Sequence, residues 1–164
     1  MRTRGVVYIH SAPLAVCSHI EWALARVLET PVRLEWSVQP VEPSARRAEC
    51  VWSGRLGTGA EIAGALRQWG MTRFEVTEEP SDGSDGERYM HVPGLGLFAA
   101  MTSANGDIVV GEDRLRRIML DARAPEALVH AIETALGTPW DCELEPYRHA
   151  SEGGGPVQRL NQVG

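Results

Sequence analysis

The 164-residue sequence contains no lysine, because all sixteen basic residues are arginine. This bias is typical of a GC-rich genome, although arginine also suits two-point contacts with anions. The formal net charge is -6, whereas proteins that bind nucleic acids or anionic membranes usually present a basic face. We therefore expect no nucleic acid and no membrane among the partners of this protein.

The sequence also lacks a long apolar run. No segment is long enough to cross a bilayer, and residues 1–4 lead directly into a short apolar segment with no export signal before it. The three cysteines, Cys17, Cys50 and Cys142, are odd in number, far apart and outside any C-x-x-C spacing. Such cysteines are typical of a reduced protein without disulfides, and we expect a cytoplasmic location.

Motifs that carry catalysis or bind metal are missing as well. The sequence has no H-E-x-x-H or cysteine–histidine ligand spacing, no G-x-S-x-G elbow, no P-loop and no dinucleotide fingerprint. The five histidines fall in separate predicted elements: His10, His19, His91, His130 and His149. We expect no metal, no cofactor and no catalytic residue, and we expect a binding protein rather than an enzyme.

What the sequence does contain is a core-forming pattern, with 43% hydrophobic and 23% charged residues. Residues 5–10 are β-branched and aromatic, which predicts a buried strand. Ser11 is the expected N-cap of the helix that follows, and Pro13 fits its first turn. The apolar stripe of this helix, which should end at Thr30, consists of Val16, Ile20, Ala23, Leu24 and Val27.

Alternating polar and apolar residues predict an antiparallel pair of strands over 32–38 and 46–53. Thr58 and Glu61 form a capping box at the start of a second helix, and residues 73–77 form a fourth strand. The order β-α-β-β-α-β predicts a ferredoxin-like split βαβ unit in which the first strand is interior and both helices cover one face. The charged residues of the other face form a solvated surface, a binding surface or a seat for the second half; they are Arg33, Glu35, Arg47, Glu49, Arg73 and Glu75.

The polar, glycine-rich stretch 80–87 predicts a linker between a first half, 1–79, and an α+β second half, 88–164, that packs on the first. Strands are expected over 88–92 and 95–102, followed by a tight turn at Asn105-Gly106 and a short third strand. Two amphipathic helices follow. The acidic, proline-interrupted segment 140–149 predicts neither a good helix nor disorder, and 157–163 could form an edge strand.

Several segments together resemble a known family, and the resemblance covers nearly the whole chain. They are residues 1–13, His19-Ile20-Glu21-Trp22, Gly57-Thr58-Gly59, 74–78, 84–86, 112–114 and 143–146. The family is the uncharacterised actinobacterial one catalogued as "domain of unknown function 3145", and it supplies no catalytic residues to carry over. Because its members are often encoded near type II fatty-acid synthase genes, the resemblance implies a link to fatty-acid or acyl-CoA metabolism.

One candidate site is the loop from Gly54 to Gly59, which leads into the N-terminus of the second helix. Free backbone N–H groups and the helix dipole favour an anion there, such as a phosphate of CoA or of a nucleotide. The residues of this anion-binding candidate are Arg55, Gly57, Thr58 and Gly59. The alternative is that the glycines only form a turn whose N–H groups the capping box already satisfies.

A second candidate site lies on the outer side of the first helix. His19, Trp22 and Arg26 share a flank away from the apolar stripe, and Trp22 lies almost opposite Ile20. Tryptophan and arginine are enriched at interface hot spots. Either the tail 140–147 covers Trp22, or a protein partner or a second copy of the chain does. The sequence thus favours a binding or regulatory protein, with a small enzyme or a CoA-type ligand-binding module as the alternative.

Overall fold

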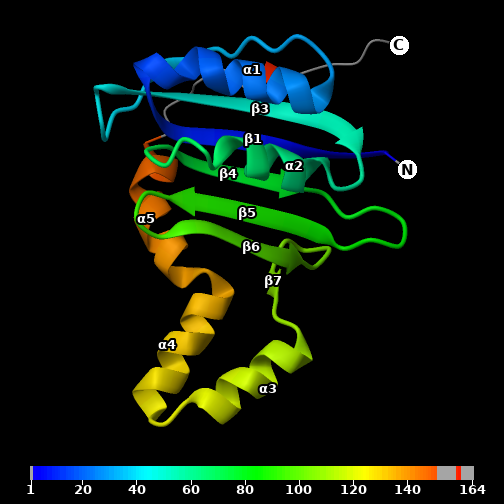
Figure 1. Ribbon diagram of the computed structural model, residues 1–164, viewed down its shortest axis with the longest axis vertical. Helices are drawn as coiled ribbons and strands as arrows, with labels where there is room; N and C mark the ends of the chain where they lie inside the picture. Colours follow the sequence, from blue (N-terminus) through cyan, green and yellow to red (C-terminus); the bar gives the residue numbers. More distant parts are fainter. Residues whose placement is uncertain (1, 151–157, 160–164) are drawn as a thin grey trace.

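The computed structural model describes residues 2–150 and 158–159, which form a mixed α+β fold built on one sheet (Figure 1). The antiparallel strand order is β2-β3-β1-β4-β5-β6-β7, and β8 pairs in parallel with β3. The strands are β1 (Arg2–Pro13), β2 (Ser37–Val38), β3 (Ala45–Arg55), β4 (Arg73–Glu78), β5 (Gly86–Val92), β6 (Gly96–Thr102), β7 (Ile108–Val109) and β8 (Gln158–Arg159). The helices are the 3-10 turn η1 (Leu14–Val16) and the α-helices α1 (Cys17–Leu28), α2 (Thr58–Leu66), α3 (Glu112–Asp121), α4 (Pro125–Leu136) and α5 (Thr138–His149).

The first strand is interior, as the sequence predicted. It pairs with β3 on one side and β4 on the other, so that Val7 lies opposite both Cys50 and Val76. The prediction that Ser11 caps the next helix is wrong, because β1 continues to Pro13 and α1 begins only after η1. The Ser11 hydroxyl instead donates a hydrogen bond of 2.6 Å to the Glu42 carboxylate.

The predicted strand over 32–38 is wrong for most of its length, since only Ser37 and Val38 form a strand. The cause is the buried carboxylate of Glu21 on α1. It accepts hydrogen bonds from the Leu34 backbone N–H (2.8 Å) and the Trp36 indole N–H (3.2 Å). The backbone of this segment therefore bonds to a helix side chain rather than to β3, and its apolar alternation reflects packing rather than sheet pairing.

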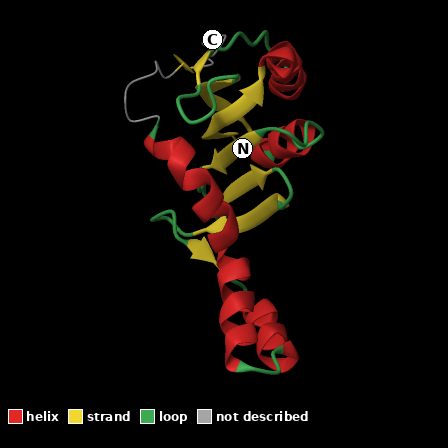
Figure 2. Ribbon diagram, turned by 90° about the vertical axis from the view of Figure 1, so that its left-hand side faces the viewer, coloured by secondary structure: helices red, strands yellow, loops and turns green. Residues whose placement is uncertain are grey.

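The sheet is covered on both faces (Figure 2). Helices α1 and α2 lie side by side on one face, and α5 crosses the other. The larger core lies beneath α1 and α2 and includes Ile20, Leu24, Ile62 and Phe74. A smaller core beneath α5 contains Met90, Val92, Phe98 and Leu144.

Segment 140–149 lies within helix α5, so the prediction that it is neither a good helix nor disordered is wrong. Pro139 stands in its first turn, where a missing N–H costs nothing. Pro146 stands in its last turn, so it interrupts only the end of the hydrogen-bond ladder. The helix starts against the sheet at Gly137, where φ is +82° and an added Cβ would lie 2.7 Å from the Met90 methyl carbon. Leu144, one helical turn after Trp140, is fully buried.

Charged side chains, of which Glu75 and His10 are buried and the others half-buried, also hold α5 on the sheet. The Glu75 carboxylate on β4 lies 2.8 Å from Nε2 of His10 and accepts hydrogen bonds from Arg148 (2.7 Å) and Arg88 (2.8 Å). Both arginines also bind Asp141 of α5, at 2.7 and 3.0 Å. The sequence left three alternatives for the charged face of the sheet: a solvated surface, a binding surface or a surface on which the second half packs. Glu75 serves the third, because it binds Arg148 of α5. We refer to His10, Glu75, Arg88, Asp141 and Arg148 as the charge cluster.

The charge cluster sets the ionisation of Glu75. Burial by itself raises the pKa of this carboxyl group, but the hydrogen bonds from His10 and Arg148 outweigh burial and hold its pKa well below the usual range. An ionised carboxylate beneath α5 can therefore pair with both arginines at neutral pH.

The remaining elements of the second half agree with the sequence. The Asn105-Gly106 turn forms with φ of +85° at Gly106, and α3 and α4 occupy the predicted segments. Residues 79–85 connect β4 to its neighbour β5, and Gly86 and Glu87 of the predicted linker belong to β5, so the sheet continues from the first half into the second. Of the predicted edge strand 157–163, Gln158 and Arg159 form β8, and the other residues lie outside the described part of the chain. None of the helices in the described residues is long and apolar enough to cross a membrane.

Candidate functional site

The N-terminus of α2, the predicted anion-binding site, binds a carboxylate of the protein itself. The Gly57 N–H donates to one oxygen of Glu78 at 2.8 Å, and the Gly59 N–H donates to the other at 2.7 Å. The predicted capping box is wrong. The N-cap residue is Gly57 rather than Thr58, and the Glu61 carboxylate pairs with Arg55. A carboxylate at this end of a helix is stabilised by the helix dipole.

Gly59 is needed for this contact. A Cβ at this position would lie 2.8 Å from the nearer Glu78 oxygen and 3.1 Å from the Glu78 Cβ. Glu78 and Gly59 come from different elements, β4 and α2, and nothing local in the sequence indicates that they meet. An external anion at this loop would have to bind the outward-facing side chains rather than these two N–H groups.

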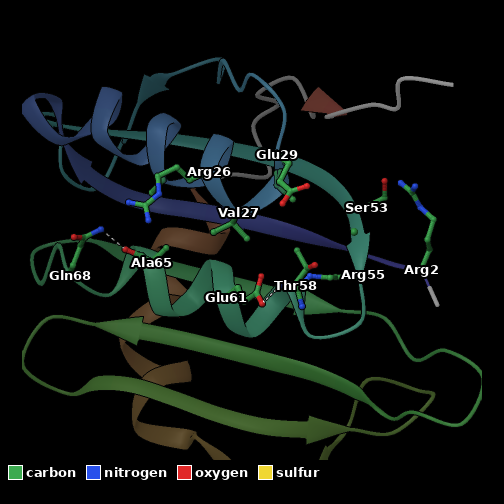
Figure 3. Close-up of a pocket in the computed structure, with 13 residues that line it drawn as sticks. Arg2, Arg26, Val27, Glu29, Ser53, Arg55, Thr58, Glu61, Ala65 and Gln68 are labelled. Carbon is green, nitrogen blue, oxygen red and sulfur yellow. Dashed lines mark hydrogen bonds and ion pairs between the residues drawn. The ribbon is translucent and has the colours of Figure 1, made fainter.

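Those side chains line a groove between α1 and α2 with a volume of about 700 Å³. Figure 3 shows Arg26 and Val27 of α1 on one side, and Thr58, Glu61 and Ala65 of α2 on the other. Arg55 and Ser53 from the end of β3 and Arg2 from the start of β1 stand at one end. We call this feature the α1–α2 groove, and its volume is in the range usual for ligand pockets.

Three arginines and two glutamates give the groove its charge. Arg55 is paired with Glu61. Arg2 and Arg26 form no ion pair with any residue that the structure describes, and the fifth charged side chain is Glu29. Two guanidinium groups are thus available, and each can hold a carboxylate or a phosphate through two parallel hydrogen bonds.

An aromatic patch lies beside the groove on the same face. The Trp22 side chain is 62% exposed. Its ring meets His19 edge to face at 5.3 Å, and His19 stacks on Trp69 at 6.3 Å. We call His19, Trp22 and Trp69 the aromatic patch. Arg26 follows Trp22 by one helical turn, so it joins the aromatic patch to the α1–α2 groove.

The predicted cover of Trp22 by the tail 140–147 is wrong. That segment is part of α5, which lies on the opposite face of the sheet (Figure 2). The sequence predicted that α1 lies on the sheet through its apolar stripe, and Ile20, Ala23 and Leu24 are buried as expected. Within the described residues, the outward face of α1 therefore carries an indole ring that this chain leaves largely exposed.

The structure brings together residues that the sequence assigned to two separate sites. Arg26 from the predicted partner-binding set lines the same groove as Arg55 and Thr58 from the predicted anion-binding set. Sequence reasoning missed Arg2, which precedes the first predicted strand and carries no pattern. It also did not place Trp69 near His19; Trp69 lies just beyond the end of α2, packs partly against the larger core and contacts His19.

The thiols and other potential ligands lie apart from this surface. Cys17 and Cys50 are buried free thiols, and Cys142 is an exposed one. Burial raises the pKa of Cys50 to about 12 and also raises that of Cys17. No group of three or more His, Cys, Asp or Glu side chains in the described chain is arranged to hold a metal ion.

Comparison with known proteins identifies the lineage of the chain. A search of curated proteins and a search of solved structures found no match. Residues 6–162 match the model of one family, described as "Protein of unknown function (DUF3145)". This match extends over nearly the whole sequence and agrees with the resemblance of the segments at both ends. The chain therefore belongs to the DUF3145 family of proteins of unknown function.

Proposed function

We propose that this protein is a binding or regulatory protein without catalytic activity, and that it binds an acidic segment of a protein partner on the face formed by α1 and α2. The observation that carries the proposal is the exposed Trp22 next to a groove with two arginines that form no ion pair within the described part of the chain. Tryptophan and arginine contribute most to binding when a partner covers them. Trp22 is the anchor, and Arg2 and Arg26 bind carboxylates of the partner.

The chemistry of the aromatic patch supports a protein partner. Trp22 and His19 already contact each other edge to face, so little side-chain freedom is lost when a partner covers them. Arg26 borders the patch, and Arg2 stands at the end of the adjoining groove. An aromatic centre with polar groups around it matches the usual anatomy of an interface. An acidic segment would satisfy both guanidinium groups, whereas a basic one would be repelled.

The second candidate function is a module that binds CoA or a nucleotide in the α1–α2 groove. The volume of the groove favours it, and Arg26 and Arg55 can hold phosphate groups. The Gly57 and Gly59 N–H groups already bind Glu78. A phosphate would therefore bind the arginine side chains, with the Arg55–Glu61 pair opening to admit it.

We further propose that the partners are enzymes of fatty-acid or acyl-CoA metabolism in an actinobacterial cytoplasm, as the family resemblance implies. We also infer that residues 5–78 form a ferredoxin-like split βαβ unit. The order β2-β3-β1-β4, with α1 and α2 on one face, supports this inference. Sites built on the helices of a scaffold are held more precisely than sites on loops, which suits a docking surface on α1 and α2.

Affinity capture from native extract with Trp22→Ala tests the first function, and Leu14→Ala is its matched control. Both side chains are 62% exposed, so neither substitution should change the free energy of unfolding by more than about 0.5 kcal/mol. We expect a captured partner to be lost with Trp22→Ala and kept with Leu14→Ala. A partner that both variants retain equally would contradict the proposed surface.

The shift of melting temperature with CoA distinguishes the second function, since a ligand that binds only the native state raises that temperature. Saturable stabilisation by CoA that disappears in Arg26→Ala and Arg55→Ala but persists in Trp22→Ala would favour the ligand-binding module. Arg67→Ala, an exposed arginine just after α2 and outside the groove, is the control. No shift in the wild type would rule out CoA as the ligand.

A further inference from the structure

Helices α3 and α4 extend away from the sheet as a separate arm (Figures 1 and 2). We call residues 112–136 the helical arm. No residue of α3 is buried, and Ala135 is the one buried residue of α4. Helices of ten and twelve residues are marginal in water unless an apolar face is packed against something. The described chain provides the arm with little more than its own two helices.

The arm exposes large apolar side chains on both helices. Met119 and Leu120 are 70% and 80% exposed. The other members of this set are partly exposed: Leu115, Val129, Ile132 and Leu136. Between the helices runs a groove of about 400 Å³ whose apolar lining is Ile118, Ala122, Ala127 and Ala131. The arm thus carries protruding apolar side chains and a groove that is apolar along part of its lining, and exposed apolar surface of this kind marks an interaction site.

The two helices of the arm differ in charge. Helix α3 carries three arginines and three acidic residues, and Arg114, Arg117 and Asp121 border the groove. The charged residues of α4 are Glu126 and Glu133. Among the residues that the structure describes, neither the two arginines at the groove nor the two glutamates form an ion pair. The one ion pair found within the arm joins Arg116 to Glu112 on α3. Opposite charges thus stand unpaired on two neighbouring helices of one surface.

We propose that the helical arm binds the arm of a second copy of this chain, with α3 of each copy on α4 of the other. A two-fold axis places the same surface against itself, so the arginines of α3 meet the glutamates of α4 twice. The protruding Met119 and Leu120 fill the groove of the opposite copy. The product is a four-helix bundle, in which each short helix buries the stripe that it exposes in a single chain.

The size of the arm determines the strength of this dimer. At 1.5 Å per residue the helices are about 15 and 18 Å long, so the contact is at the small end of specific interfaces. We expect a dimer that forms at high protein concentration and dissociates on dilution. Because charge pairs contribute, the dimer should weaken as the salt concentration rises.

Sedimentation of the full chain, from about 1 µM to about 1 mM, tests the apolar part of the proposal. We expect a monomer–dimer equilibrium whose dissociation constant rises at least about tenfold in Met119→Gln. Met71→Gln is the matched control, because Met71 is also 70% exposed but lies outside the arm, and it should leave the equilibrium unchanged. A wild type that is monomeric over the whole range, or a dimer insensitive to Met119→Gln, would overturn the proposal.

Reversal of charge tests the reciprocal pairing. The variant Arg114→Glu/Arg117→Glu and the variant Glu126→Arg/Glu133→Arg each place like charges against each other in a homodimer, so each should sediment as a monomer. An equimolar mixture restores opposite charges at both contacts and should form a heterodimer. Far-ultraviolet circular dichroism of each variant checks that the helices persist. Two folded variants that stay monomeric after mixing would refute an arrangement of α3 on α4.

Discussion

Helices α5 and α3 are both short and amphipathic, but they are held in different ways. Helix α5 buries Leu144 completely and contributes Asp141 and Arg148 to the charge cluster beneath it. Helix α3 buries no residue, and its ion pair, Arg116 with Glu112, is on the surface. The comparison shows that an amphipathic pattern predicts where a helix forms but not how much of its stability the same chain provides.

The ion pairs of α5 are also less exposed than the ion pair of α3. Exposed pairs contribute about 0–1 kcal/mol, because water already solvates both charges. Removal of the buried carboxylate of a cluster costs more, since the buried His10 and the half-buried arginines that surround it lose their shared partner. The sheet with α1, α2 and α5 should therefore respond strongly to single substitutions, and the helical arm of a monomer should respond weakly.

The largest expected effect is that of Glu75→Ala. This substitution leaves His10, Arg88 and Arg148 without their shared carboxylate, so we expect the free energy of unfolding to fall by about 3–5 kcal/mol. The matched substitution in the arm, Glu112→Ala, should cost less than about 1 kcal/mol. Urea unfolding monitored by circular dichroism measures both, and equal losses would contradict the comparison.

The next effect concerns apolar packing. Leu144→Ala should lower the free energy of unfolding by about 2–5 kcal/mol, because Leu144 is fully buried between α5 and the sheet. Leu120→Ala removes the same atoms from an 80% exposed position and should change it by less than about 0.5 kcal/mol. Both measurements belong at a protein concentration low enough for a monomer. A large loss for Leu120→Ala under those conditions would show that the arm is packed within one chain.

The third effect is a dependence on pH. The pKa of Glu75 is lowered in the folded state, so the unfolded chain takes up a proton at this group before the folded chain does. Its contribution to stability is complete above the usual glutamate pKa of about 4.3 and is lost as pH falls below that value. The free energy of unfolding should thus decrease less steeply below about pH 4 in Glu75→Gln than in the wild type. Parallel curves would contradict a role for this carboxylate in acid stability.

The features that the sequence predicted correctly depend on neighbours in the chain. The interior strand β1, the turn at Asn105-Gly106 and the stripe around Ile20 follow from local periodicity and turn chemistry. The features it missed depend on distant partners. Glu21 binds the Leu34 backbone from a helix, and Glu78 binds the N-terminus of α2 from another strand. Neither carboxylate differs in sequence from a solvated one.

The same reason explains the candidate site and helix α5. The sequence indicated Arg26 and Arg55 separately, but only the packing of α1 beside α2 places them in one groove. Segment 140–149 was judged by its prolines and acidic residues. The helix is held in place by Arg148, which pairs with Glu75, and by Asp141, which pairs with Arg88; both partners lie more than fifty positions away in the sequence. Charge patterns do not show which opposite charges will meet after folding.

The smallest expected effect is that disruption of the helical arm leaves the rate at which the sheet opens unchanged. Leu120→Gly should destabilise α3 by about 1 kcal/mol through helix propensity alone. Cys50 lies in β3 beneath the helices, and burial raises its pKa to about 12, so a thiol reagent can reach its thiolate only when the sheet opens. If the arm and the sheet open independently, the labelling rate of Cys50 in Leu120→Gly should equal that of the wild type.

The control is Leu144→Gly, which should accelerate the labelling of Cys50 because it loosens α5 from the sheet. Mass spectrometry of labelled peptides separates Cys50 from Cys142, which is exposed and should react at once in every variant. Faster labelling of Cys50 in Leu120→Gly would show that the arm and the sheet unfold as one unit, and the contrast between the two regions would then be wrong.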